Sequence, residues 1–245
     1  MGTVLVTGGS RGIGRGICQA FLEEGYNVAF TCRSLENLNI GLAKLNQYAV
    51  KSKVVGILCD SGIYIDVKRA IEKVVEEFNG IDILINNAGV RKYGSIFDLS
   101  VEEWIESVNT NINGFFFFCK EALPHLLKSS NPWIFNIGST AGRVPFAGGV
   151  AYNTTKSAVY GFSDSIQLDV RNKGVRVCNI CPGNVFNKEF KCPKEEDWQM
   201  KPEDIGYTIT SLININNRAM PSLLEIRPTI IPEHPEKGIR SLRYV

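Results

Sequence analysis

The start of the chain passes from a β-rich run into a glycine turn without a spare residue. The sequence VLVTGGSRGIG covers Val4–Gly14, with three residues between Gly8 and Gly12 and one between Gly12 and Gly14. Glycines let the backbone turn tightly, and a helix that begins there presents unpaired N–H groups to a phosphate. The spacing differs from GxGxxG, and many β–α turns need a glycine. Placed directly after the first strand, however, it predicts a dinucleotide site.

Short apolar runs alternate with helical patterns along the rest of the chain. The predicted strands are Val4–Val6, Val28–Cys32, Val54–Leu58, Ile83–Asn86, Trp133–Ile137, Val175–Ile180 and Leu224–Ile226. The predicted helices include Gly14–Glu24, Ile65–Phe78, Val101–Lys128 and Ala151–Lys173. Most of these strands are apolar on both faces, as parallel strands covered by helices are. Residues 1–245 are therefore expected to form a single α/β domain with a doubly wound (Rossmann) parallel sheet of about seven strands.

Two segments are expected to be irregular. Residues 184–201 are polar and broken by Pro193, which predicts a substrate loop over the site. Residues 229–245 carry Pro232 and Pro235, which oppose regular structure.

Composition excludes several classes of protein. With 44% apolar and 21% charged residues in 245, the chain fits one ordinary globular domain. A net charge of +2 gives no electrostatic case for nucleic acid or an anionic membrane. No apolar stretch approaches the roughly 20 residues that span a bilayer, and the first residues already read as strand and turn rather than a leader. We therefore expect a cytoplasmic protein.

The cysteines and histidines predict neither a disulfide framework nor a metal site. The seven cysteines are scattered singly, as reduced buried thiols in the cytosol are. Cys178 and Cys181 form a CxxC, but on a strand they point to opposite faces and lie too far apart to bond. His125 and His234 lack metal-ligand spacing, so no metal is expected.

The choice of dinucleotide follows from charge at the end of the second strand. Enzymes for NAD usually carry an acidic residue about 20 residues after the glycine turn, where this chain has Cys32. Arg11 in the turn and Arg33 after the strand could both reach a 2′-phosphate, which a guanidinium pairs with bidentately. Either arginine alone would read as a solvated surface residue. Together, with the acid absent, they predict NADP(H).

Tyr152 and Lys156 lie four residues apart in AYNTTK, and Ser139 lies thirteen residues upstream of Tyr152. Residues at this spacing share a helix face, and a nearby ammonium favours the phenolate, which makes tyrosine a usable acid–base group. Ser139 could then hold a substrate oxygen against Tyr152. Each feature alone is a common accident.

The joint order and spacing of the motifs resemble the short-chain dehydrogenase/reductase family, in its single-domain branch and similar to its β-ketoacyl reductase-like members. The resemblance runs from Thr3 to roughly Pro232. It rests on TGGSRGIG, Asp60, NNAG at Asn86–Gly89, Asn111 in TNINGFF, Ser139, YNTTK and CPG at Cys181–Gly183.

The resemblance implies a catalytic tetrad of Asn111, Ser139, Tyr152 and Lys156, in which Asn111 supports a water that links Lys156 to solvent. The residues that it and the charge argument assign to the cofactor are Gly8, Ser10, Arg11, Gly12, Ile13, Gly14, Arg33, Ser34, Asp60, Ser61, Asn87, Ala88, Gly89, Tyr152, Lys156, Pro182, Gly183, Val185 and Asn187. It also implies a homodimer or homotetramer that pairs the helices of residues 101–128 and 151–173, with apolar surface from Phe115–Phe118 and Phe162, some of which must face the sheet.

Two departures from the family pattern put the substrate in doubt. Asn187 stands where the family usually has threonine, and the loop that follows is shorter than in typical ketoacyl reductases. The usual glycine-rich C-terminus is replaced by EIRPTIIPEHPEKGIRSLRYV. In the family, the loop that follows the position of Asn187 normally forms the lid over the substrate.

These patterns favour an NADPH-dependent oxidoreductase that reduces a ketone or other carbonyl to an alcohol, with Tyr152 as general acid. Two alternatives stay open. The same residues would serve an NADP-dependent secondary-alcohol dehydrogenase working in the oxidative direction. A non-catalytic NADP(H)-binding regulator is the third reading, although it would not need Tyr152 and Lys156 together.

Overall fold

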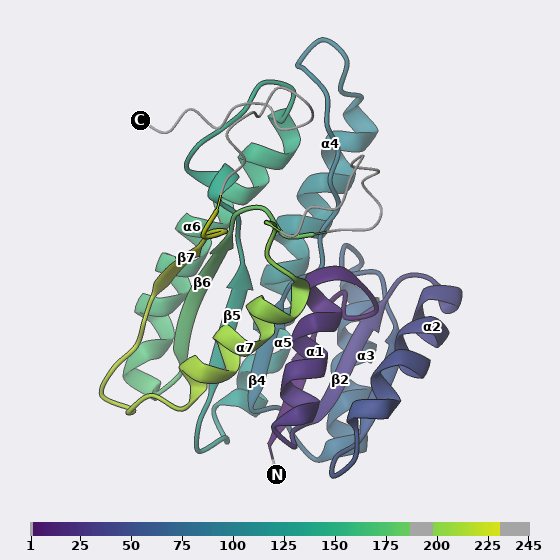
Figure 1. Cartoon of the computed structure of the whole chain (residues 1–245), viewed down its shortest axis with the longest axis vertical. Coiled ribbons are helices and arrows are strands. Elements are labelled where there is room, and N and C mark those ends of the chain that lie inside the picture. Colours follow the sequence, from purple (N-terminus) through teal and green to yellow (C-terminus); the bar gives the residue numbers. More distant parts are fainter. Residues whose placement is uncertain (1, 187–197, 231–245) are drawn as a thin grey trace.

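One parallel sheet organises the computed structural model, which describes residues 2–186 and 198–230 (Figure 1). The strands lie in the order β3-β2-β1-β4-β5-β6-β7, and every neighbouring pair is parallel. Their bounds are β1 Thr3–Val6, β2 Asn27–Cys32, β3 Val54–Leu58, β4 Ile83–Asn86, β5 Trp133–Ile137, β6 Arg176–Pro182 and β7 Leu223–Ile226. The predicted doubly wound α/β fold is confirmed.

Helices cover both faces of the sheet (Figure 1). The helices on one face are α1 Gly12–Glu23, α2 Leu35–Leu45 and α7 Pro202–Ile213. The helices on the other are α3 Tyr64–Phe78, α5 Gly114–Leu126 and α6 Val150–Val170. A shorter helix, α4 Val101–Val108, leads into α5.

The core divides into two clusters because successive strand residues point to opposite faces. On β1, Val4 and Val6 pack in the cluster under α1, while Leu5 packs in the cluster under α3 and α5. The strands β1, β4, β5 and β6 are buried along their whole length. This double burial is why their sequences read as continuous apolar runs rather than alternating ones.

The helices α1 and α7 lie side by side across one face of the sheet (Figure 1). Their backbones approach so closely that a Cβ at Gly16 would lie 2.3 Å from the carbonyl carbon of Pro202. A Cβ at Gly206 would lie 2.5 Å from the Gly16 oxygen. The start of α7 has Pro202 in its first turn, where a missing N–H costs nothing, and the Asp204 carboxylate accepts a hydrogen bond from the Lys201 N–H at 2.7 Å.

The predicted helices are wrong in one respect, and the examples taken from the sequence do not include α2 and α7. The predicted helix over 101–128 is interrupted, because α4 ends at Val108 and a π-helical turn over Asn109–Asn113 precedes α5. Within the expected substrate loop of residues 184–201, Val185 and Met200 form an isolated β-bridge. Asn187 and most of the expected tail lie outside the described residues.

Among the described cysteines, Cys178 and Cys181 are buried in β6 and unpaired, as their strand spacing predicts. None of the helices described here is long and apolar enough to cross a membrane.

Candidate active site

The predicted site residues gather at the carboxyl edge of the sheet. Parallel strands end at a common edge, and ligands of such sheets bind where the strand order reverses, here between β1 and β4. The glycine turn follows β1, Asn87 follows β4 and Ser139 follows β5. The fold therefore brings the turn and the tetrad candidates to one edge.

The glycine turn has the geometry that a pyrophosphate needs. Gly12 has φ +52° and no atom within 4 Å of where its Cβ would lie, so the space before the helix is open. A Cβ at Gly14 would lie 2.3 Å from the Gly8 oxygen, so only glycine permits this approach. The N-cap residue of α1 is Arg11, whose side chain has no acceptor that could cap the first N–H groups of the helix. The first N–H groups of α1 are thus left to an anion, which fits a dinucleotide phosphate.

The side chains of Thr7 and Asn87 hold the turn in place, and sequence reasoning gave Thr7 no such role. Thr7 Oγ1 accepts hydrogen bonds from the N–H groups of Asn87 and Ala88, both at 2.9 Å. Asn87 Nδ2 donates to the carbonyl oxygens of Thr7 at 2.9 Å and Gly8 at 3.2 Å. The Asn87 side-chain NH₂ group therefore donates to the backbone of the turn. A contact between Asn87 and a cofactor stays a prediction. The signal was present as a threonine just before the glycines and an asparagine after β4.

The residues after β2 lie beside the turn. Ser10, which is buried, directs its hydroxyl to Cys32 Sγ at 3.2 Å. Ser34 caps α2 by accepting a hydrogen bond from the Asn37 N–H at 3.4 Å. Arg33 is half-exposed, and its Nη1 lies 3.0 Å from Glu106 Oε1. The predicted arginine thus reaches the site, but it contacts a carboxylate that the sequence did not single out.

The segment after β3 is fixed by its own backbone contacts. Asp60 Oδ1 accepts a hydrogen bond from the Gly62 N–H at 2.8 Å, and Oδ2 lies 3.9 Å from Arg33 Nη1. Ser61 is buried, and its carbonyl oxygen would lie 2.7 Å from a Cβ at Gly114. Asp60 and Ser61 therefore lie between the end of β2 and the start of α5.

Lys156 is a buried ammonium. Its side chain on α6 is 6% exposed, and Nζ donates a 2.6 Å hydrogen bond to the carbonyl oxygen of Ile137, the last residue of β5. Burial, with a smaller contribution from the Arg91 guanidinium, lowers the pKa of this ammonium to about 8. The ring centroid of Phe115 lies 5.9 Å from Nζ. A lysine with one backbone partner and such a pKa is typical of a functional site.

Aromatic rings surround Tyr152, one helical turn before Lys156. The ring centroid of Tyr93 lies 5.7 Å from that of Tyr152, edge to face, and the Phe146 centroid lies 6.3 Å away. Tyr93 and Phe146 also contact each other at 5.8 Å. Burial and the neighbouring Tyr152 raise the pKa of the Tyr93 hydroxyl. The predicted general acid thus stands beside an apolar aromatic wall, which the sequence did not reveal because its members lie in three separate segments.

Ser139 lies immediately beyond β5 and is buried. Its Oγ accepts a hydrogen bond from the Ala141 N–H at 3.1 Å, which shapes the turn that follows. The Tyr160 hydroxyl, one turn beyond Lys156 on α6, donates to the Ser139 carbonyl oxygen at 3.2 Å. Tyr160 is a support that sequence reasoning missed, and it ties the serine to the helix that carries Tyr152.

Asn111 lies in the π-helical turn and is almost fully buried. Its Oδ1 accepts from the Val90 N–H at 2.8 Å, while Nδ2 donates to the Val90 carbonyl at 3.0 Å and to Thr155 Oγ1 at 3.0 Å. Single π-turns inside helices are common at functional sites. Asn111 therefore joins three elements: the π-turn, the segment after β4, and α6 beside Lys156.

Of the cofactor residues predicted after β6, the structure describes Pro182, Gly183 and Val185. Pro182 ends the strand, and the Gly183 N–H donates to the Ile226 carbonyl on β7 at 2.7 Å. Val185 pairs with Met200 in the bridge already noted. These residues lie at the same edge as the tetrad.

Known proteins resemble this chain in sequence and in fold. A model of the short chain dehydrogenase family matches residues 2–195. The chain belongs to this family. The protein is similar to a 2-(R)-hydroxypropyl-CoM dehydrogenase of Xanthobacter autotrophicus, 35% identical over 184 residues, which are 74% of this chain and 73% of the relative. It is also similar to a 3-oxoacyl-(acyl-carrier-protein) reductase of Staphylococcus aureus, 33% identical over 187 residues, 76% and 75% of the two chains.

Solved structures share the fold of this protein. An alcohol dehydrogenase from the archaeon Thermococcus sibiricus, complexed with 5-hydroxy-NADP, superposes with a TM-score of 0.85 at 26% identity, covering 96% of this chain and 100% of that one. A short chain dehydrogenase from Burkholderia cenocepacia, in complex with NADP, gives 0.84 at 28% identity, covering 93% and 96%. As a member of this family, the protein is an oxidoreductase.

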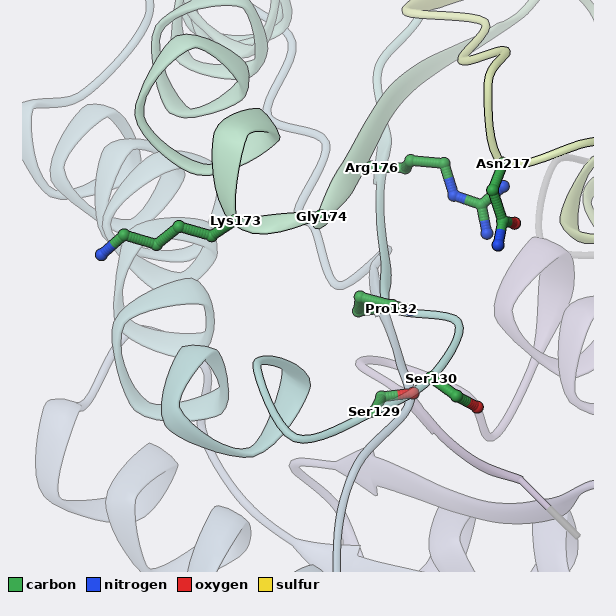
Figure 2. Close-up of a pocket in the computed structure, with 7 residues that line it drawn as sticks. All are labelled: Ser129, Ser130, Pro132, Lys173, Gly174, Arg176 and Asn217. Carbon is green, nitrogen blue, oxygen red and sulfur yellow. The ribbon is translucent and has the colours of Figure 1, made fainter.

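A cavity of about 230 Å³ lies at the opposite edge of the sheet, near the starts of β5 and β6 (Figure 2). Arg176 lines it, but its guanidinium lies 4.1 Å over the Trp133 ring and binds Asn131 Oδ1. The Lys173 side chain extends away from the other lining residues (Figure 2). No charges converge there, so we assign it no part in the chemistry. In the described part of the protein, no cluster of histidine, cysteine and acidic residues could hold a metal.

Proposed function

We propose that this protein is an NADPH-dependent carbonyl reductase that converts a ketone or other carbonyl compound to its alcohol. The observation that carries the proposal is the buried Lys156 ammonium on the helix that also presents Tyr152, beside the carboxyl edge where the glycine turn opens.

In this mechanism a reduced nicotinamide supplies the hydride that goes to the carbonyl carbon. Tyr152 donates its hydroxyl proton to the carbonyl oxygen, and the Lys156 ammonium stabilises the phenolate that remains. Ser139 Oγ hydrogen-bonds the same oxygen and holds it against Tyr152. Asn111 fixes the segment after β4 and the helix around Lys156 through its three hydrogen bonds.

The preference for NADP(H) is supported by charge and by the neighbours. Arg33 stands directly after β2, Arg11 stands at the start of α1, and the position expected for an NAD-type acid is Cys32. Two structural neighbours carry NADP or a derivative of it. Arg33→Ala should therefore weaken NADPH binding and leave NADH binding unchanged, as measured by fluorescence titration. A variant that binds both cofactors as the wild type does would contradict this preference.

The oxidative direction is the second candidate, favoured by the resemblance to a relative named as a 2-(R)-hydroxypropyl-CoM dehydrogenase. The same residues would act in reverse, with the Tyr152 phenolate accepting the alcohol proton. Assaying alcohols with NADP⁺ beside carbonyls with NADPH would tell which direction the enzyme favours.

We also propose a cytosolic homodimer or homotetramer. Phe116 on α5 is 52% exposed and Leu168 on α6 is 63% exposed, so both helices present apolar side chains to solvent in the single chain. The six described cysteines are free, as reduced thiols in the cytosol are. Light scattering should give the mass of two or four chains, and Phe116→Asp should lower it. A monomeric wild type would refute the assembly.

The decisive assay follows NADPH absorbance with a panel of ketones, β-ketoacyl thioesters and aldehydes. Tyr152→Phe should abolish turnover and keep NADPH binding, because the phenol is needed for proton transfer alone. Turnover that survives in Tyr152→Phe would refute the assigned mechanism. If NADPH binds but no panel member reacts, a regulator becomes the better reading.

A further inference from the structure

Glu106 on α4 binds two cations that come from different parts of the site. Its Oε1 lies 3.0 Å from Arg33 Nη1, and its Oε2 lies 3.0 Å from Lys92 Nζ. Arg33 follows β2, and Lys92 follows β4 in the segment that also carries Tyr93. No motif assigned Glu106 a role. One carboxylate therefore connects the arginine expected at a 2′-phosphate with the segment beside Tyr152.

The Arg33 side chain crosses the edge of the sheet in this arrangement. Besides Glu106, its Nη1 lies 3.9 Å from Asp60 Oδ2, after β3. Arg33 and Asp60, both expected at the cofactor, thus lie close together, and Arg33 also contacts Glu106. A cofactor phosphate that binds Arg33 would have to replace its contact with Glu106.

The 2′-phosphate and Glu106 compete for the same donor. A phosphate monoester pairs with a guanidinium through the charge-assisted bonds that a carboxylate uses. Lys92 and Arg33 lower the pKa of Glu106, so it is charged at neutral pH. A carboxylate beside a bound phosphate also repels it, because like charges at this range cost free energy.

We infer that Glu106 is a cofactor-discriminating residue that holds Arg33 in the absence of cofactor and opposes the 2′-phosphate. When the 2′-phosphate binds the Arg33 guanidinium, Glu106 loses its contact with Arg33 and keeps its contact with Lys92. The cofactor phosphate is then connected to the segment that carries Tyr93 next to Tyr152. The inference rests on the proposed use of NADP(H).

The test is the affinity for NADPH and NADH, measured by fluorescence titration of the intact protein without substrate. Glu106→Gln should tighten NADPH binding about two- to fivefold, the range of an exposed ion pair, and leave NADH unchanged. Glu102→Gln, an exposed acid on the same helix, controls for net charge and should stay within experimental error of the wild type. Unchanged or weaker NADPH binding in Glu106→Gln overturns the inference, since an acid that merely orients Arg33 would act in that direction.

A second test measures NADPH affinity in the Lys92→Met variant. Without Lys92, the Glu106 charge acts on Arg33 alone, so NADPH binding should weaken about twofold in the wild-type background. In the Glu106→Gln background the same change should have no effect. Equal effects in both backgrounds would overturn the connection through Glu106.

The two proposals fail in different ways. Arg33→Ala that leaves NADPH affinity unchanged refutes the proposed cofactor preference. Arg33→Ala that weakens NADPH, combined with Glu106→Gln that does not tighten it, refutes only the role of Glu106.

Discussion

The Lys156 ammonium donates its 2.6 Å hydrogen bond to the Ile137 carbonyl, which joins α6 to the end of β5 beneath the site. The contact orients Lys156 and positions Tyr152 one turn away on the same helix. It also places a charge where water is excluded, and a single carbonyl does not replace full hydration. Stability is therefore given up at the point where the chemistry needs a charge.

The first prediction is that Lys156 makes the free energy of unfolding depend on alkaline pH. Its pKa is about 8 in the folded protein, against 10.5 as the ordinary value. Between these values the unfolded chain binds more protons, so stability rises with pH from 8 to 10.5 and is lost as pH falls toward 8. Lys156→Met removes this titration.

The measurement is urea unfolding of the wild type and Lys156→Met at several pH values. The advantage of the methionine variant should be largest below pH 8 and shrink above it, by up to about 3 kcal/mol. Lys120→Met, an exposed lysine of α5, corrects for the change in overall charge. A constant difference between wild type and Lys156→Met across this range would show that the buried amine does not titrate there.

The second prediction concerns Asn111. Asn111→Ala leaves the Val90 N–H and carbonyl and the Thr155 hydroxyl without this partner. We expect the free energy of unfolding to fall by about 2–3 kcal/mol, since net hydrogen bonds contribute about 1 kcal/mol each. Asn113→Ala, in the same π-turn, removes the hydrogen bond that its side chain donates to Asn109 Oδ1 and should cost less than about 1 kcal/mol. If chemical denaturation shows the same loss in the free energy of unfolding for both variants, the stability comes from the turn as a whole rather than from the hydrogen bonds of Asn111.

The π-turn marks the limit of sequence-based prediction in this protein. The segment over 101–128 reads as one continuous helix, because nothing local in Asn109–Asn113 specifies an extra residue per turn. The distortion instead accompanies contacts with distant residues: Asn111 bonds to Val90 and Thr155, and Gly114 packs against Ser61. Such tertiary contacts have no periodic signal.

The sheet and the site edge were predictable for a physical reason. Strands buried on both faces are mostly apolar along their length, and β1, β4, β5 and β6 match the expected runs to within two residues at each end. Parallel pairing then brings the residues after β1, β4 and β5 to one edge. In α7, by contrast, a readable start signal was overlooked, with Pro202 and Asp204 in the first turn.

The third prediction tests Thr7, which sequence reasoning missed as a support. Thr7→Val replaces the hydroxyl that accepts from the Asn87 and Ala88 N–H groups with a methyl of similar size. We expect a loss of about 1–3 kcal/mol in the free energy of unfolding, because both donors then lack their acceptor. Thr7→Ser keeps the acceptor and should retain most of the stability. If the two variants unfold at the same urea concentration, these hydrogen bonds do not hold the turn.

The last prediction separates the glycine turn from ordinary helix glycines. Gly14→Ala places a Cβ 2.3 Å from the Gly8 oxygen, so the turn and the start of α1 must move apart. NADPH affinity should then fall at least tenfold, about 1.4 kcal/mol, because the leading N–H groups no longer converge on the phosphate. Gly161→Ala, on α6 with no atom within 4 Å of the new Cβ, should instead stabilise the protein by about 0.5–1 kcal/mol without altering NADPH binding. Calorimetric titration and thermal unfolding of both variants test this contrast. Wild-type affinity in a folded Gly14→Ala protein would mean that the turn does not hold the phosphate.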